Sequence, residues 1–248
     1  MRAPQRSILM GRQRRWAPSN LGASLLALWD AERSDLITKS SGLVSSLKDS
    51  VAGYDAVQAV GASKPTYGAT SFNGRPGLTL DGVDDQMTYG STTGIPTGAT
   101  PFEAWAVFDQ NVGTGDMTNN TIMGWGGAGG SVRFDLLRMV SGGVNRAAIN
   151  IGNGSTNVQV VNTSVDFSGR HVVRAIVTGT TAQIDVDGIA SSPVSVVPAL
   201  GTTRLVIGAA PSLASFGQGI LSAAGITAPL TTDQAALMLA WGNARRGA

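Results

Sequence analysis

Short apolar runs separated by turn residues recur along most of the chain, and they predict an all-β protein. Alternating apolar and polar positions bounded by Gly, Pro, Asn or Asp are typical of strands. The predicted strands are Leu25–Trp29, Leu43–Leu47, Ala56–Ala59, Gly77–Asp81, Gln86–Tyr89, Phe102–Asp109, Thr121–Trp125, Val132–Val140, Arg146–Ile151, Asn157–Val161, His171–Thr178, Thr181–Val186, Ile189–Ser192, Arg204–Ile207 and Gly219–Ile226. Asp187-Gly188 supplies the positive φ angles of a tight hairpin turn, and Gly152-Asn153-Gly154 predicts a second reversal.

The two ends of the chain follow other patterns. Thr231 and Gln234 have the spacing of a capping box, and apolar residues then recur at helical intervals, which predicts a helix over 231–246. Residues 1–18 lack periodicity and end at Pro18. We interpret them as an arm outside the core, preceding a single domain over 19–248.

The composition narrows the class of protein. A chain of 248 residues is long enough for one large core. No run approaches the roughly 18 apolar residues of a membrane span, and the start does not read as a secretory signal. We therefore expect no membrane association and synthesis in the cytosol. The absence of Cys excludes disulfides, thiolate zinc sites and cysteine nucleophiles.

The net charge of +2 conceals an uneven distribution. Five arginines precede any acidic residue, and two more lie at the other end, whereas residues 17–244 carry 11 basic and 16 acidic side chains. A mildly acidic body argues against a nucleic-acid-binding surface on the folded domain. This argument does not apply to the basic N-terminal segment, which lies outside the predicted domain.

The stretch from Leu25 to Tyr89 resembles the opening of concanavalin A-like, or laminin-G-like, jelly-roll domains. The matching residues are Leu28-Trp29-Asp30-Ala31, Asp49, Gly53, Asp55, Ala56, Pro65, Tyr67, Asn73-Gly74, Pro76 and Leu80-Asp81-Gly82-Val83-Asp84-Asp85. The segments His171–Gly188, Val206–Gly208 and Gly219–Ser222 resemble later strands of the same family. The resemblance implies a sandwich of two curved antiparallel sheets, with Leu47 replacing a tryptophan that many relatives carry.

The fold hosts enzymes, but few residues here suit catalysis. Glycosidases of this fold use two carboxylates presented on a single strand. The only glutamates, Glu32 and Glu103, lie in different elements, and Asp187 is more simply a turn residue than a partner for Asp185. His171 is the only histidine, and we interpret it as a hydrogen-bonded ring at a strand end rather than a general base. We expect a protein that is not an enzyme and has no organic cofactor.

The sequence suggests two possible binding sites, each of which also has a structural explanation. Asp81, Asp84 and Asp85 place three carboxylates within five residues, which suits calcium, but the same run is explained by a turn in which Asp accepts backbone N–H groups. Trp125 lies in a glycine-rich run that could present its ring to a glycan, whereas core packing explains Trp29, Trp105 and Trp241.

The basic arm suggests an anchoring role. Its guanidinium groups suit acidic or phosphate partners, and an indole at its end could fill a pocket; the residues are Arg2, Arg6, Arg12, Arg14, Arg15 and Trp16. A disordered tail is the alternative. Because the domain resembles structural proteins of tailed bacteriophages, we predict a homo-oligomeric virion component held by this arm, such as a capsid-decorating, tail or fibre protein, that contacts host surface glycans. The alternative function is a carbohydrate-binding module outside any virion.

Overall fold

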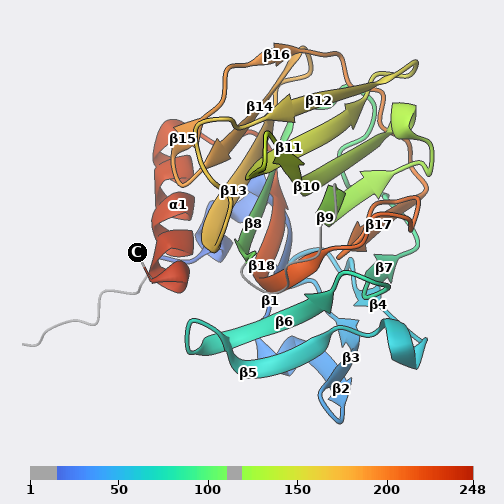
Figure 1. Ribbon diagram of the computed structural model, residues 1–248, viewed down its shortest axis with the longest axis vertical. Coiled ribbons are helices and arrows are strands. Elements are labelled where there is room, and N and C mark those ends of the chain that lie inside the picture. Colours follow the sequence, from blue (N-terminus) through green and yellow to red (C-terminus); the bar gives the residue numbers. More distant parts are fainter. Residues whose placement is uncertain (1–15, 111–118, 248) are drawn as a thin grey trace, which may run out of the picture.

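The structure, a computed structural model, describes residues 16–110 and 119–247 and confirms an all-β sandwich (Figure 1). Its strands are β1 (Leu25–Asp30), β2 (Ile37–Ser40), β3 (Leu43–Leu47), β4 (Ala56–Val57), β5 (Thr66–Phe72), β6 (Arg75–Asp81), β7 (Met87–Tyr89), β8 (Phe102–Asp109), β9 (Asn119–Gly126), β10 (Arg133–Ser141), β11 (Val144–Gly152), β12 (Asn157–Val161), β13 (Arg170–Val177), β14 (Thr181–Val186), β15 (Ile189–Ala190), β16 (Val194–Ser195), β17 (Arg204–Ile207) and β18 (Gln218–Thr227). The helical segments are η1 (Pro18–Ser24), η2 (Ser34–Leu36), η3 (Gly61–Ser63), η4 (Gly130–Val132) and α1 (Thr232–Arg246).

Antiparallel pairing arranges these strands in two layers. In the first layer, β18 pairs with β8 on one edge and with β1 and β6 on the other, and β13 and β14 extend the layer beyond β8. The second layer has the order β4–β7–β17–β9–β10–β11–β12. Strands β3 and β5 connect the layers at one end, because β3 pairs with both β4 and β5, and β5 pairs with β6.

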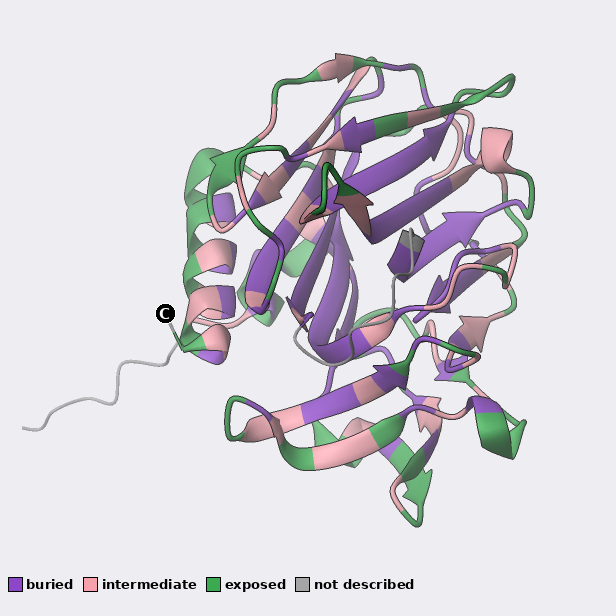
Figure 2. Ribbon diagram, viewed as in Figure 1, coloured by how far each residue is buried: buried purple, intermediate pink, exposed green. Residues whose placement is uncertain are grey.

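The main core lies between the two layers, where Figure 2 shows buried residues on nearly every central strand. Its largest fully buried side chains include Trp29 from the first layer and Trp125 and Phe134 from the second. Leu47, the residue that replaces a tryptophan of the resembled family, is also buried in this core.

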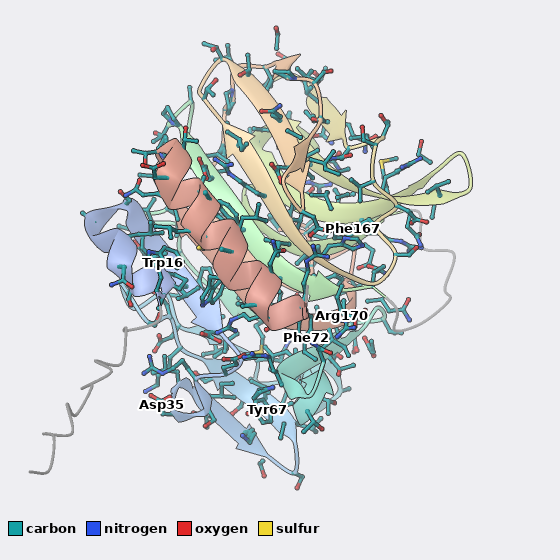
Figure 3. All side chains as sticks on the ribbon, turned by 90° about the vertical axis from the view of Figure 1, so that its left-hand side faces the viewer. Trp16, Asp35, Tyr67, Phe72, Phe167 and Arg170 are labelled. Atoms are coloured by element: carbon teal, nitrogen blue, oxygen red, sulfur yellow. The ribbon has the colours of Figure 1, made fainter. Side chains whose placement is uncertain are left out.

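Helix α1 covers the outer face of the first layer (Figure 3). Strand β8 is therefore buried on both faces: Ala104 and Ala106 point into the main core, while Trp105 and Val107 join a second cluster that includes Met238 of α1. The alternation of side chains along a strand explains this division. The helix begins as predicted, because the Thr231 and Gln234 side chains each accept a hydrogen bond from the other residue's backbone N–H.

The last turn of α1 is tied to the sheets by a buried ion pair. The Arg245 guanidinium donates to both carboxylate oxygens of Asp30 on β1, at 2.8 Å each, and to the Ser222 hydroxyl at 3.3 Å. The β14–β15 turn is also as predicted, because Asp187 and Gly188 have φ angles of 56° and 88°. Among the described residues, no helix has the length and apolar character needed to cross a membrane.

Candidate functional site

The structure brings Asp81, Asp84 and Asp85 together, with one carboxylate oxygen of each lying within 4.8 Å of the others. Two of the three accept hydrogen bonds within the turn, and Asp84 Oδ2 accepts one from the Ser63 hydroxyl at 3.0 Å. Asp81 Oδ1 accepts the backbone N–H groups of Val83, Asp84 and Asp85, and Asp85 Oδ2 accepts the N–H of Asp81. Burial raises the pKa of Asp85 to about 6, and the charges of Asp81 and Asp84 act in the same direction. The geometry matches the turn interpretation, and calcium stays a prediction.

Trp125 does not present its ring to solvent, so the prediction that it contacts a glycan is wrong. Its side chain is fully buried, and its indole N–H donates to the carbonyl of Pro96 at 2.8 Å. The ring packs against Phe102 and Phe134, with centroids 4.8 and 4.3 Å away. In the glycine-rich run, alternation along β9 places Gly124 on the outer face and turns Trp125 toward the core.

The five arginines of the predicted arm (Arg2, Arg6, Arg12, Arg14 and Arg15) lie outside the described residues. Trp16 is described, and it is half-buried against the cluster beneath α1 of its own chain. Inserting it into a partner would require breaking that contact. Trp16 also borders a groove beside α1.

His171 is a hydrogen-bonded ring at a strand end, as predicted. Its two ring nitrogens contact Asp187 Oδ2 at 2.8 Å and the Ser168 carbonyl at 3.0 Å. Asp187 also accepts the backbone N–H of Val172 and pairs with Arg246 at 3.2 Å. Although burial alone acts to raise it, these partners hold the pKa of Asp187 below its usual value. Asp187 therefore links its hairpin to α1, and His171 links the same carboxylate to the start of β13.

The other carboxylates considered for catalysis also have partners within the fold. Glu103 is buried and forms a bidentate pair with Arg174 at 2.7 and 2.8 Å. Glu32 pairs with Arg75 at 2.9 Å. Asp185 accepts a backbone N–H of its hairpin, and burial raises the pKa of its carboxyl. None of these contacts forms a two-carboxylate arrangement on one strand.

A continuous row of outward positions crosses the second layer. Cross-strand register defines it, because directly paired residues point to the same face of a sheet. From β4 to β12 the row consists of Val57, Thr88, Val206, Gly124, Asp135, Asn150 and Gln159. This row cannot be recognised in the sequence, because its members come from seven strands that only the folded register aligns.

The loop between β17 and β18 covers the middle of the row. Gly124 leaves room for Pro211 of this loop, since a Cβ at Gly124 would lie 2.9 Å from the Pro211 ring. Beneath the loop, Asp135 is buried beside Arg133, which also donates to the Ser212 hydroxyl at 3.1 Å. Burial raises the pKa of Asp135 to about 6, against the effect of Arg133. Asp135 Oδ1 has no hydrogen-bond partner among the described residues.

One end of the row opens into a cavity of about 500 Å³, which we call the sheet-face groove. Its walls carry two amides, two hydroxyls, one guanidinium and one apolar side chain: Gln58, Gln86, Thr88, Thr203, Arg204 and Leu213. Within the described residues, Gln86 Oε1 is a buried acceptor without a partner. The volume of the sheet-face groove is that of a typical ligand site. The groove thus offers hydrogen-bonding groups with a single charged side chain.

Comparison with known proteins identifies the fold. No family model and no curated relative matches the sequence. Among solved structures, an arabinofuranosidase complexed with arabinofuranosyl-α-1,2-xylobiose aligns with a TM-score of 0.62 and 11% identity over 89% of this chain and 58% of that chain. Domain 4 of AbnA, an arabinanase from Geobacillus stearothermophilus in complex with arabinotriose, aligns with a TM-score of 0.56 and 11% identity over 88% of this chain and 98% of that domain.

These likenesses define the class of the fold. The chain is a β-sandwich of the lectin and glycanase type, as the resemblance to concanavalin A-like domains implied. It spans little more than half the length of the arabinofuranosidase chain, which it covers to 58%. At 11% identity the comparison shows the fold, and the activity of those proteins does not follow from it.

Proposed function

We propose that this chain is a carbohydrate-binding β-sandwich domain that holds saccharide in the sheet-face groove. The observation that carries the proposal is the chemistry of the second layer's outer face. Thr88, Gln86 and Arg204 present hydroxyl, amide and guanidinium groups in one cavity of about 500 Å³. Saccharides carry many hydroxyls and usually no charge, so they match a site made of such groups.

An unpartnered acceptor in the groove supports the same ligand class. Gln86 Oε1 is buried without a donor among the described residues, and an unsatisfied buried acceptor is unfavourable. A polyhydroxylated ligand supplies donors to such a face directly or through bridging water. The proteins of similar fold whose structures contain arabinotriose and arabinofuranosyl-xylobiose add weight to saccharide as the class.

Calorimetric titration with arabinotriose, xylotriose, maltotriose and 3′-sialyllactose tests the proposal. We expect Thr88→Arg to abolish binding, because the longer side chain fills the groove, and Arg204→Ala to weaken it. Thr38→Arg is the matched control, since Thr38 is an exposed strand threonine on β2 that does not line the groove. Binding that is equal in Thr88→Arg and Thr38→Arg, with both variants folded by circular dichroism, would refute the sheet-face groove as the site.

The proposed role is non-catalytic, since the candidate acids have structural partners. A virion function stays a prediction, because it rests on the arm, whose arginines the structure does not describe. Deleting residues 1–15 tests it, and the deletion stops short of Trp16 because that ring packs against the domain. On the virion hypothesis this truncation loses particle incorporation and keeps saccharide binding; unchanged incorporation would contradict a role for the arm.

A further inference from the structure

A second groove, of about 520 Å³, lies beside α1, on the other layer from the sheet-face groove. We call it the tryptophan groove, after Trp16 and Trp241. Figure 3 shows Trp16 beside η1, on the flank of α1. Its lining includes two indoles, one leucine and three charged side chains: Trp16, Trp241, Leu237, Glu32, Arg75 and Arg245.

Both indoles in this groove are held in place by packing. Trp16 and Trp241 are half-buried against the cluster that contains Met238 and Leu25. The Arg245 guanidinium, itself fixed by Asp30, lies over one face of the Trp241 ring, 4.1 Å from its centroid, so a ligand can contact only the part of this indole that Arg245 leaves uncovered. An aromatic surface that is already ordered loses little conformational entropy when a ligand stacks on it.

The charged groups of the groove neutralise one another. Glu32 lies 2.9 Å from Arg75 and 3.3 Å from Arg245, and Arg245 is paired with Asp30 at 2.8 Å. Two guanidinium groups therefore face two carboxylates. An ionic ligand would have to compete with these pairs, whereas a neutral ligand would not. Glu32 and Arg75 are still 28% and 39% exposed, so they offer an acceptor and donors at the rim.

We propose that the tryptophan groove is a second saccharide-binding site, which takes a neutral sugar ring against the indoles of Trp16 and Trp241. A sugar ring has an apolar face and carries hydroxyls at its edge. The apolar face fits the aromatic walls of the groove, and the hydroxyls fit its polar, charge-balanced rim. The ligand class rests on the proposed function, but the residues are entirely different. Either site can therefore fail without the other.

The indole N–H resonances of the full-length protein provide the test. The chain has five tryptophans, so five indole signals are expected and can be assigned with single Trp→Phe variants. Trp29 and Trp125 serve as internal references, because both are buried and their N–H groups donate to backbone carbonyls. Titration with arabinotriose, xylotriose and maltotriose should shift the Trp16 and Trp241 signals and leave the references in place. Unmoved Trp16 and Trp241 signals with all three sugars at millimolar concentration would overturn the proposal.

Two further variants separate this site from nonspecific effects. Ala240→Gln extends a side chain into the groove from an exposed helix position, and Ala236→Gln makes the same change on α1 outside it. Glutamine is a good helix former, so both should fold. We expect Ala240→Gln to raise the dissociation constant about tenfold or more and Ala236→Gln to leave it unchanged; equal affinities would overturn the assignment.

The Thr88→Arg variant distinguishes the two grooves. If the tryptophan signals still shift in this variant, the second site binds independently of the sheet-face groove. If Thr88→Arg removes those shifts, they arise from binding at the sheet-face groove, and the tryptophan groove is not a site.

Discussion

Breaking the buried ion pair between Arg245 and Asp30 should strongly destabilise the protein, and Arg245→Met tests this. The two side chains are 7% and 10% exposed, and two charge-assisted hydrogen bonds of 2.8 Å join them. Methionine keeps an apolar stem over Trp241 but leaves the Asp30 carboxylate buried without its counter-charge. Removing one member of a buried pair destabilises a protein by about 3–5 kcal/mol. A typical domain is stable by only about 5–15 kcal/mol, so the effect should be easily measured.

The assay is urea unfolding followed by far-ultraviolet circular dichroism. Arg33→Met is the matched control, because Arg33 and Asp35 also form a bidentate pair, at 2.7 and 2.9 Å, but are 52% and 61% exposed. Solvent-exposed pairs contribute little, so this control should not measurably shift the midpoint. The double variant Asp30→Leu with Arg245→Met should recover part of the loss, since it removes both charges. Equal destabilisation by Arg245→Met and Arg33→Met would refute the argument from burial.

Three other predictions concern single positions. The pKa of Asp135 is raised to about 6, so its contribution to stability is complete below about pH 4 and is lost as pH rises through 6, by up to about 3 kcal/mol. Asp135→Asn should therefore gain stability over the parent between pH 4 and 7.5 in urea unfolding, and a constant difference would contradict this. Gly124→Ala should lower the free energy of unfolding by about 1–3 kcal/mol, because the new Cβ would lie 2.7 Å from the Phe134 carbonyl oxygen, whereas Gly61→Ala, with open space, should not. EDTA should leave the melting temperature unchanged, because Asp81 and Asp85 already bind backbone N–H groups; a fall that Ca²⁺ reverses, and that Asp84→Asn abolishes, would instead establish a calcium site.

Strands with strong local patterns were predictable from the sequence. β8, β12, β14 and β17 have the predicted boundaries, and the capping box of α1 and the Asp187-Gly188 turn are as expected. Each of these signals depends on residues close together in the chain, so no tertiary contact is needed to interpret it.

The strands absent from the prediction depend on distant partners. β2 buries only Ile37, and β5 is largely polar or glycine with a shifted register, so neither has a clear alternation. β16 has only two residues. Their pairing is decided by neighbouring strands. The error at Trp125 has a similar cause, because glycines on both sides suggested an exposed loop, whereas β9 continues through Gly126 and pairs on both edges.

The position of α1 determines which outer face of the sandwich a helix covers and which it leaves to polar side chains. Outward positions on the first layer that lie beneath α1 include the apolar residues Trp105, Val107 and Val172. Outward positions on the second layer include Asn150 and Gln159, whereas Gly124 and Asp135 lie beneath the loop between β17 and β18. The face of a sheet that is turned away from the core needs either a covering element or polar side chains. At the sheet-face groove the second layer therefore presents polar side chains to a ligand, whereas the tryptophan groove lies between α1 and the segment before η1.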